Sequence, residues 1–215
     1  YFIGRVHQQS IVPMPRPRVV VGIPVGATEV EKRAVFDATM AAGAREVYLI
    51  EEPTAAMLGA GLPLADAQGT MIVDIGGGTT DLAVFYEGIL KHTAVIPFAG
   101  ENITNDIKTG LGVLKTQAEQ MKVQFGSALA NEAKANAYIT IPGLRGMPAK
   151  EISVKNLANI IQARMSEIMD FVTYHLKQVG LDNKALNGGI ILTGGGSQLK
   201  HLIQLTEYVT GLNAR

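Results

Sequence analysis

The sequence contains no cysteine among its 215 residues, and its positive and negative charges balance. The absence of cysteine excludes disulfides, thiolate zinc sites, iron–sulfur clusters and cysteine nucleophiles, and it fits a reducing compartment. Nineteen Lys and Arg residues against nineteen Asp and Glu residues give a formal net charge of zero. A protein held to nucleic acid or anionic lipid by its overall charge needs a basic excess, so we expect no nucleic-acid partner.

Long hydrophobic runs are also missing, since no apolar stretch approaches the roughly 18 residues that cross a bilayer. No charged-then-apolar signal segment opens the chain. The G-x-S-x-G motif of serine hydrolases, the Walker A loop and the G-x-G-x-x-G fingerprint are absent. The four histidines lie far apart along the chain without paired-ligand spacing, which argues against a zinc site: His7, His92, His175 and His201. We therefore predict a cytoplasmic globular protein without a membrane segment.

The first part of the chain, residues 1–65, alternates short β-branched runs with helical segments, the order of a parallel α/β layer. Residues 1–10 have the pattern of the end of a helix. Fully buried strands are predicted at residues 18–24 and 46–50. A helix follows each strand, its start marked by a capping box or by a proline in the first turn: Thr28 with Glu31, and Pro53.

The second part, residues 66–215, begins at a predicted hinge over residues 61–69 and has a different order. Two apolar runs flank a glycine turn and a third follows a tight turn, which predicts an antiparallel meander and a mixed α/β domain. A capping box predicts that a helix starts at Thr116, and Ser153 is predicted to cap the longest helix. An apolar strand and a final helix that ends at a glycine close the chain.

The sharpest motif is a loop with three glycines, two threonines and a flanking acid on each side, between two predicted strands. Glycines let the backbone approach an anion, and their N–H groups cradle phosphate oxygens. Threonine hydroxyls add donors, and an aspartate at a strand end can hold Mg²⁺ through water. A plain glycine hairpin is the alternative. We predict phosphate binding by the following residues, with Asp74 as the magnesium ligand: Asp74, Gly76, Gly77, Gly78, Thr79 and Thr80.

Three further features could belong to a nucleotide site. A strand runs into Gly194, Gly195 and Gly196 ahead of a predicted helix start, and such a start binds anions unless it is only a tight turn. Glu119 and Lys122 share one helix face, although a capping box or a simple ion pair would also explain them. Two acids, Glu51 and Glu52, end a parallel strand, where α/β proteins place their sites.

Taken in order, these pieces resemble the actin-like ATPase superfamily, and the resemblance spans essentially the whole chain. Residues 74–80 are similar to the second phosphate loop of the family, and residues 192–196 to its adenosine motif. Glu119 and Lys122 match the pair that reaches the ribose and adenine. The resemblance implies an actin-like (ribonuclease H-like) α/β fold, with a partial first domain at 1–65 and a second domain with an outer subdomain at 66–215. It also implies ATP or ADP with Mg²⁺ as cofactors.

Within the superfamily, residues 1–80 are similar to MreB and residues 81–215 to FtsA. The resemblance implies an ATP-binding protein of the bacterial cell-shape and division machinery, and we expect an FtsA-like anchor of the division ring. An MreB-type filament protein is the first alternative. Other open alternatives are a chaperone or sugar-kinase ATPase, and a fused or designed scaffold that keeps the motifs without their function.

The resemblance also suggests partners and a reaction. Self-association into filaments is expected of MreB, and binding of the FtsZ C-terminal tail is expected of FtsA. That tail is acidic, and residues 138–177 supply cations for it: Arg145, Lys150, Lys155 and Arg164. In MreB-like proteins an acid orients the attacking water, which here would be Glu52 with Thr79 opposite. The first phosphate loop of the family is not found in this sequence, so we expect slow ATP hydrolysis at most.

Overall fold

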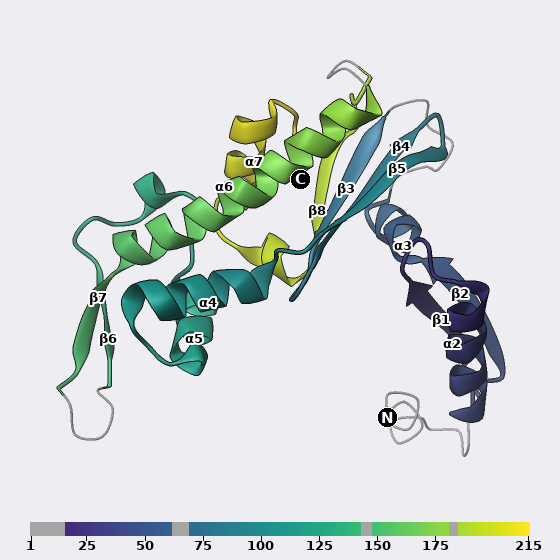
Figure 1. Ribbon diagram of the computed structural model, residues 1–215, viewed down its shortest axis with the longest axis horizontal. Coiled ribbons are helices and arrows are strands. Elements are labelled where there is room, and N and C mark those ends of the chain that lie inside the picture. Colours follow the sequence, from purple (N-terminus) through teal and green to yellow (C-terminus); the bar gives the residue numbers. More distant parts are fainter. Residues whose placement is uncertain (1–15, 62–68, 143–147, 181–184) are drawn as a thin grey trace. The chain divides into compact units, whose positions relative to one another are not determined.

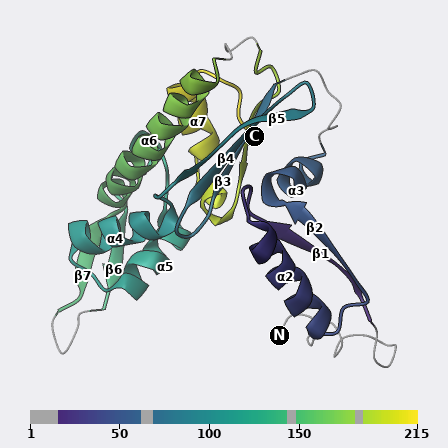
Figure 2. The same cartoon turned by 45° about the vertical axis from the view of Figure 1, so that its right-hand side comes forward.

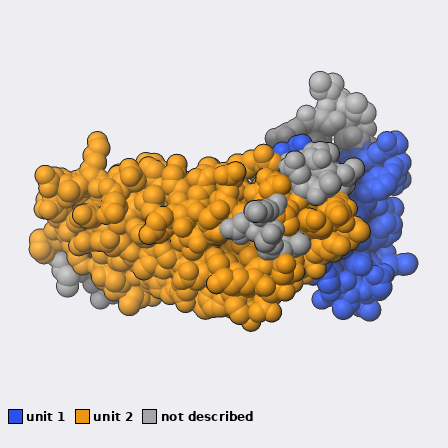
Figure 3. Space-filling model, turned by 90° about the horizontal axis from the view of Figure 1, so that it is seen from above, with its two compact units in different colours: residues 1–63 blue, residues 64–215 orange. Residues whose placement is uncertain are grey.

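The computed structural model describes residues 16–61, 69–142, 148–180 and 185–215. They form two compact units, residues 1–63 and residues 64–215, which Figure 3 colours separately. The predicted helix end at residues 1–10 lies outside the described residues, as does most of the predicted hinge.

The first unit is a βαβ layer followed by a second helix (Figure 1). Strand β1 (Arg18–Ile23) pairs in parallel with β2 (Glu46–Glu51), and α2 (Glu29–Ala41) forms the crossover between them. Helix α3 (Glu52–Gly59) begins directly after β2, with a proline in its first turn. The predicted order of strands and helices is therefore observed.

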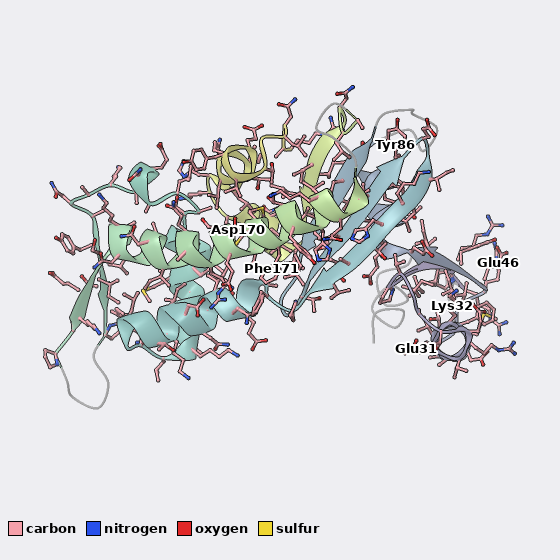
Figure 4. The ribbon with its side chains drawn as sticks, turned by 45° about the horizontal axis from the view of Figure 1, so that its top comes forward. Glu31, Lys32, Glu46, Tyr86, Asp170 and Phe171 are labelled. Atoms are coloured by element: carbon pink, nitrogen blue, oxygen red, sulfur yellow. The ribbon has the colours of Figure 1, made fainter. Side chains whose placement is uncertain are left out.

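Helix α2 starts where its capping box predicts. The Thr28 hydroxyl accepts from the Glu31 N–H at 3.3 Å, and the Glu31 carboxylate accepts from the Thr28 N–H at 2.8 Å. Figure 4 shows Glu31 on this helix beside its neighbour Lys32. The prediction that β1 and β2 are fully buried is wrong: Ile23 is the only buried residue of β1, Val20 is 65% exposed, and no residue of β2 is buried. In the described part of this unit the sheet has only two strands, and its apolar side chains are incompletely covered.

The second unit is built on a four-stranded sheet in the order β5-β4-β3-β8. The predicted meander is present: β3 (Thr70–Ile75), β4 (Thr80–Tyr86) and β5 (Ile89–Ile96) are antiparallel neighbours. Strand β8 (Gly189–Thr193) joins the other edge of β3 in parallel. The glycine turn between β3 and β4 and the glycines after β8 therefore follow neighbouring strand ends, because β3 and β8 point the same way.

The helices of this unit gather around the long helix α6 (Val154–Val179), which Ser153 caps as predicted. Helices α4 (Gly100–Leu111) and α5 (Lys115–Phe125) lie side by side near its N-terminal half, and α7 (Leu202–Thr210) packs on it (Figures 1 and 2). The smaller elements are the hairpin β6 (Tyr138–Ile141) with β7 (Lys150–Ser153), and the 3-10 turns η1 (Ala130–Glu132) and η2 (Gly195–Gln198).

One apolar stripe along α6 forms the centre of the core. Its buried residues recur at the three- and four-residue spacing of a helix face: Leu157, Ile161, Met165, Ile168, Met169, Val172 and Leu176. They pack against one face of the sheet and against the buried sides of α4, α5 and α7. None of the described helices is long and apolar enough to cross a membrane.

Candidate functional site

The second unit contains a cavity of ≈ 540 Å³, a volume typical of small-molecule sites. Four elements surround it: the turn between β3 and β4, the first turn of α4, the middle of α5, and η2 with the residues after it. Three of the predicted motifs meet here, because the cavity is lined by Gly76 and Gly77, by Glu119 and Lys122, and by Gly195 and Gly196.

The glycine turn after β3 is fixed by the first turn of α4. The Gly76 N–H donates to Thr79 O at 3.0 Å and closes the turn. The N–H groups of Gly100 and Glu101 donate to the carbonyls of Gly76 and Gly77, at 3.1 and 2.7 Å. Two of the free N–H groups at the start of α4 are thereby satisfied. Added Cβ atoms at Gly77 and Gly78 would meet no atom within 4 Å, so this stretch of backbone is open to a ligand.

Two carboxylates lie at the base of the same turn. Asp74 of β3 faces Asp81 of β4 in the strand register, and the Thr79 hydroxyl donates to Asp81 Oδ2 at 2.9 Å. Partial burial, together with the charge of Asp81, raises the pKa of Asp74. Magnesium binds through one or two carboxylates and keeps several waters. A pair of carboxylates is therefore compatible with a magnesium ion held mainly by water and phosphate. Among the described residues, no group of three or more metal-binding side chains is found.

Lys122 is the most buried charge of the cavity, with 14% of its side chain exposed. Its ammonium donates to Glu119 Oε2 at 2.8 Å, to Thr104 Oγ1 at 2.8 Å and to Gly100 O at 2.9 Å. The Thr104 hydroxyl also lies within hydrogen-bond distance of the Glu119 carboxylate. Partial burial raises the pKa of Glu119, but the bonds from Lys122 and Thr104 outweigh it and leave that pKa lowered. Glu119 and Lys122 therefore form a fixed ion pair that joins α5 to α4.

The predicted capping box of this helix is wrong. Helix α5 begins at Lys115, its N-cap is Leu114, and the Gln117 amide oxygen accepts from the Leu114 N–H at 3.0 Å. Thr116 therefore lies inside the first turn. Glu119 takes no part in capping, which leaves its carboxylate for Thr104 and Lys122.

The glycines after β8 divide into two kinds. A Cβ on Gly194, whose φ is +83°, would lie 2.3 Å from Asp74 Oδ1, and one on Gly196 would lie 2.3 Å from Ile75 Cγ2. Both are therefore required for packing against β3. A Cβ on Gly195 would meet nothing within 4 Å. The expected helix start is wrong: these residues form the 3-10 turn η2, and α7 begins only at Leu202.

Some of the predicted site residues do not line the cavity. Thr80 is fully buried, and its hydroxyl donates to Phe98 O at 2.7 Å, so the expected donation from this hydroxyl to a phosphate is not available. Glu52 belongs to the first unit, at the start of α3, where its side chain packs beside Gly22 at the end of β1. Two of the four cations expected to bind an acidic tail are engaged within the chain: Arg164 pairs with Asp106 and Glu167, and Lys150 donates to Leu111 O. Lys155 is exposed, and Arg145 lies outside the described residues.

Several lining residues were not predicted, and most belong to α4 or to its contact with α5. Glu101 pairs with Lys115 at the edge of the cavity, where the hydrogen bond from Lys115 lowers the pKa of Glu101. Gly100 and Thr104 also line it. The signal for α4 was present, since Ile103, Ile107 and Leu111 recur every four residues. At the end of η2 and directly after it, Gln198, Leu199 and Lys200 also line the cavity.

Comparisons with known proteins agree with this architecture. The family described as MreB/Mbl protein matches residues 1–215. The cell shape-determining protein MreB of Escherichia coli (strain K12) is 37% identical over 222 residues, which cover 99% of this chain and 64% of that protein. The cell division protein FtsA of Pseudomonas aeruginosa is 39% identical over 147 residues, 68% of this chain and 35% of that protein. The chain thus spans less than two thirds of these relatives.

Solved structures show the same likeness. The match to a crystal structure of MreB 5 of Spiroplasma citri bound to AMPPNP covers 100% of this chain and 68% of the MreB 5 chain, with 26% identity and a TM-score of 0.84. MreB5 bound to ADP gives 0.80 at 27% identity, covering 100% of this chain and 67% of that one. The ethanolamine utilization protein EutJ from Carboxydothermus hydrogenoformans shares the fold alone, at 18% identity and a TM-score of 0.71, covering 99% and 64%.

These likenesses confirm the predicted actin-like α/β fold and the predicted resemblance to both MreB and FtsA. They also differ in how much of the chain they cover. The MreB likeness extends over the whole chain and does not stop near residue 80, whereas the FtsA likeness covers 147 residues. The MreB-type alternative is therefore better supported than the FtsA-like role that we expected first.

Proposed function

The chain belongs to the MreB/Mbl protein family, and from this premise we propose that it is a nucleotide-binding, actin-like protein of the bacterial cell-shape machinery. The observation that carries the proposal is the single cavity that gathers the glycine turn after β3, the Glu119–Lys122 pair and Gly195. A relative with a TM-score of 0.84 is bound to AMPPNP, and another structure of that relative is bound to ADP.

The ligand of this site is ATP or ADP with Mg²⁺. The open backbone at Gly77 and Gly78 would receive phosphates, since N–H groups at such turns form anion sites. Asp74 would hold the magnesium ion through water, and the ion would balance the negative charges of the phosphates and of Asp81. Glu119 and Lys122 would bind the ribose, and the bare face of Gly195 leaves room for the base.

Titration with a fluorescent ATP analogue in the presence of magnesium tests this function. Replacement Gly195→Val puts a branched side chain into open space of the cavity, so we expect folding to persist and affinity to fall at least tenfold. Gly59→Val is the matched control, because a Cβ at Gly59 also meets nothing within 4 Å but lies in the first unit. Absence of binding at millimolar Mg-ATP would refute the proposal, and equal affinity of the Gly195 variant would refute the placement of the base.

We propose MreB-type self-association into filaments as the assembly role, in the cytoplasm. Sedimentation and light scattering with Mg-ATP test it, with the nucleotide-free protein as control. A second candidate role is favoured by the 39% identity to FtsA over 147 residues. For it, an FtsZ-tail peptide would bind near the exposed Lys155, since Arg164 is already paired. Peptide binding at low salt without filament formation would select the FtsA-like role.

Hydrolysis, where it occurs, would be slow, with Glu52 orienting water and Thr79 near the phosphate. Phosphoryl transfer depends on positioning and charge stabilisation, and a misplacement of about 1 Å can lower the rate roughly a hundredfold. Phosphate release by the wild-type chain and by Glu52→Ala measures this. Fast release that Glu52→Ala abolishes would overturn the expectation of weak turnover, and release that Glu52→Ala leaves unchanged would remove Glu52 from the reaction.

A further inference from the structure

Arg164 of α6 joins three segments of the second unit without lining the cavity. Its Nε donates to Asp106 Oδ2 at 2.7 Å and its Nη2 donates to Asp106 Oδ1 at 3.1 Å, so the guanidinium forms a two-pronged bond with α4. Its Nη1 pairs with Glu167 on α6 itself. With 23% of the side chain exposed, this contact is shielded from water more than a surface ion pair is.

The third segment is the link between β5 and α4. The guanidinium of Arg164 lies 5.4 Å from the centre of the Phe98 ring, a cation–π distance. The Phe98 ring also packs on Phe171 of α6, with 5.8 Å between ring centres, and Figure 4 labels Phe171 on that helix. The Phe98 carbonyl accepts the Thr80 hydroxyl. Arg164 therefore holds both the helix α4 and the residues that lead into it.

The first turn of α4 in turn holds the nucleotide site. Its N–H groups bind the carbonyls of Gly76 and Gly77, and the Gly100 carbonyl accepts from Lys122. Any rotation or shift of α4 would displace the glycine turn and the ammonium of Lys122 together. The position of α4 is thus the quantity on which two parts of the site depend.

Apolar packing is one of two kinds of contact that set that position. Ile103 and Ile107 bury one side of α4, but the hydrophobic effect itself has no direction. A two-pronged bond between a planar guanidinium and a carboxylate fixes both distance and orientation. Asp106 is on the same helix, one turn beyond Ile103, and is the group through which α6 sets the rotation of α4.

We infer that Arg164 is a positioning residue for nucleotide binding, which acts through Asp106 and Phe98 to hold the first turn of α4 against the glycine turn. This inference rests on the proposed function, because it assigns to Arg164 the geometry of that same site. It gives Arg164 a role different from the peptide contact that the sequence suggested.

The experiment compares Mg-ADP affinity and unfolding temperature across a set of variants. Arg164→Gln removes the guanidinium and its charge. Arg164→Lys keeps the charge but cannot form both bonds to Asp106. Asp106→Asn removes the negative charge of the partner and weakens the same pair. We expect each to lower affinity by about 3- to 30-fold, the range of indirect couplings. Glu167→Gln removes a contact within α6 only and should leave affinity unchanged.

The variant Val172→Ala distinguishes a loss of positioning from a general loss of stability. It removes two methyl groups of a fully buried residue of the same helix and leaves a cavity in the core. Affinity measured below all unfolding transitions should fall in the Arg164 and Asp106 variants but not in this one, even where it is the less stable protein. Hydrogen exchange of the Gly100 and Glu101 amides should also accelerate in Arg164→Gln. Wild-type affinity in Arg164→Gln and Asp106→Asn overturns the inference, as does an equal loss in Val172→Ala. Failure of the wild-type chain to bind Mg-ADP refutes the proposed function itself.

Discussion

Asp74 lies directly opposite Asp81 in the antiparallel pairing of β3 with β4. Like charges opposite each other in a sheet destabilise it, and the raised pKa of Asp74 reflects its partial burial and this neighbour. The repulsion between these two carboxylates would be relieved by a bound cation. The pair therefore connects the stability of the second unit to the proposed magnesium ion.

Asp74→Asn should stabilise the nucleotide-free protein at neutral pH and weaken Mg-nucleotide binding. Because the folded protein raises the pKa of Asp74, it binds protons more readily than the unfolded chain, so stability falls as pH rises through and above the ordinary range of a carboxyl group. Asparagine removes that loss. Urea unfolding at neutral and acidic pH measures it, and Asp37→Asn, on the surface of α2, is the control. A variant less stable than wild type at neutral pH would contradict the explanation.

The order along the chain of β1 to β5 and of β8 followed from the sequence because apolar runs and glycine turns are local signals, whereas the hairpin of β6 and β7 was not predicted. The position of α4 did not follow, although its isoleucines have helical spacing, because the glycine at its start and the asparagine in its first turn resemble a loop. The Asn102 side chain accepts the Ala99 N–H, so the asparagine caps the helix. Thr104 and Arg164 could not be placed either, since their partners lie 15 and 58 residues away along the chain.

Lys122→Met should lower both stability and nucleotide affinity. The ammonium donates to Glu119, Thr104 and Gly100 O, and its loss removes one donor from each of these acceptors, which costs roughly 1–3 kcal/mol. Arg33→Met is the control, because the Arg33–Asp37 pair is exposed and such pairs contribute about 0–1 kcal/mol. Urea unfolding and nucleotide titration measure the two effects. Equal stability of the two variants would show that the contacts of Lys122 are not structural.

Replacement by alanine should strongly lower the stability of the protein at Gly194 and leave it nearly unchanged at the neighbouring Gly195. Gly194→Ala forces a Cβ to 2.3 Å from the Asp74 carboxylate at a φ of +83°, so we expect it to destabilise the protein by about 2 kcal/mol or more. Gly195→Ala enters open space and should change stability by less than about 0.5 kcal/mol. Thermal unfolding of the two variants side by side decides this. A strong loss in Gly195→Ala would mean that η2 itself requires this glycine.

His92 and His175 lie far apart in sequence, yet the fold brings His92 Nε2 of β5 within 3.2 Å of His175 Nδ1 of α6. The spacing of the histidines along the chain gave no sign of this contact. Burial, followed by the charge of His92, lowers the pKa of His175. The pair thus favours the uncharged ring of His175 and joins the edge strand to the long helix in that state.

This contact should make the folded protein less stable in mild acid. Because the pKa of His175 is lower in the folded state, the unfolded chain binds the proton more readily, so stability is full above the unfolded value of 6.5 and is lost as pH falls below it. Urea unfolding at several points between about pH 5 and pH 8 should show this slope in the wild type and a smaller one in His175→Gln. Val172→Ala, on the same helix, should lower stability at every pH without changing the slope. An unchanged slope in His175→Gln would mean that other groups carry the acid sensitivity.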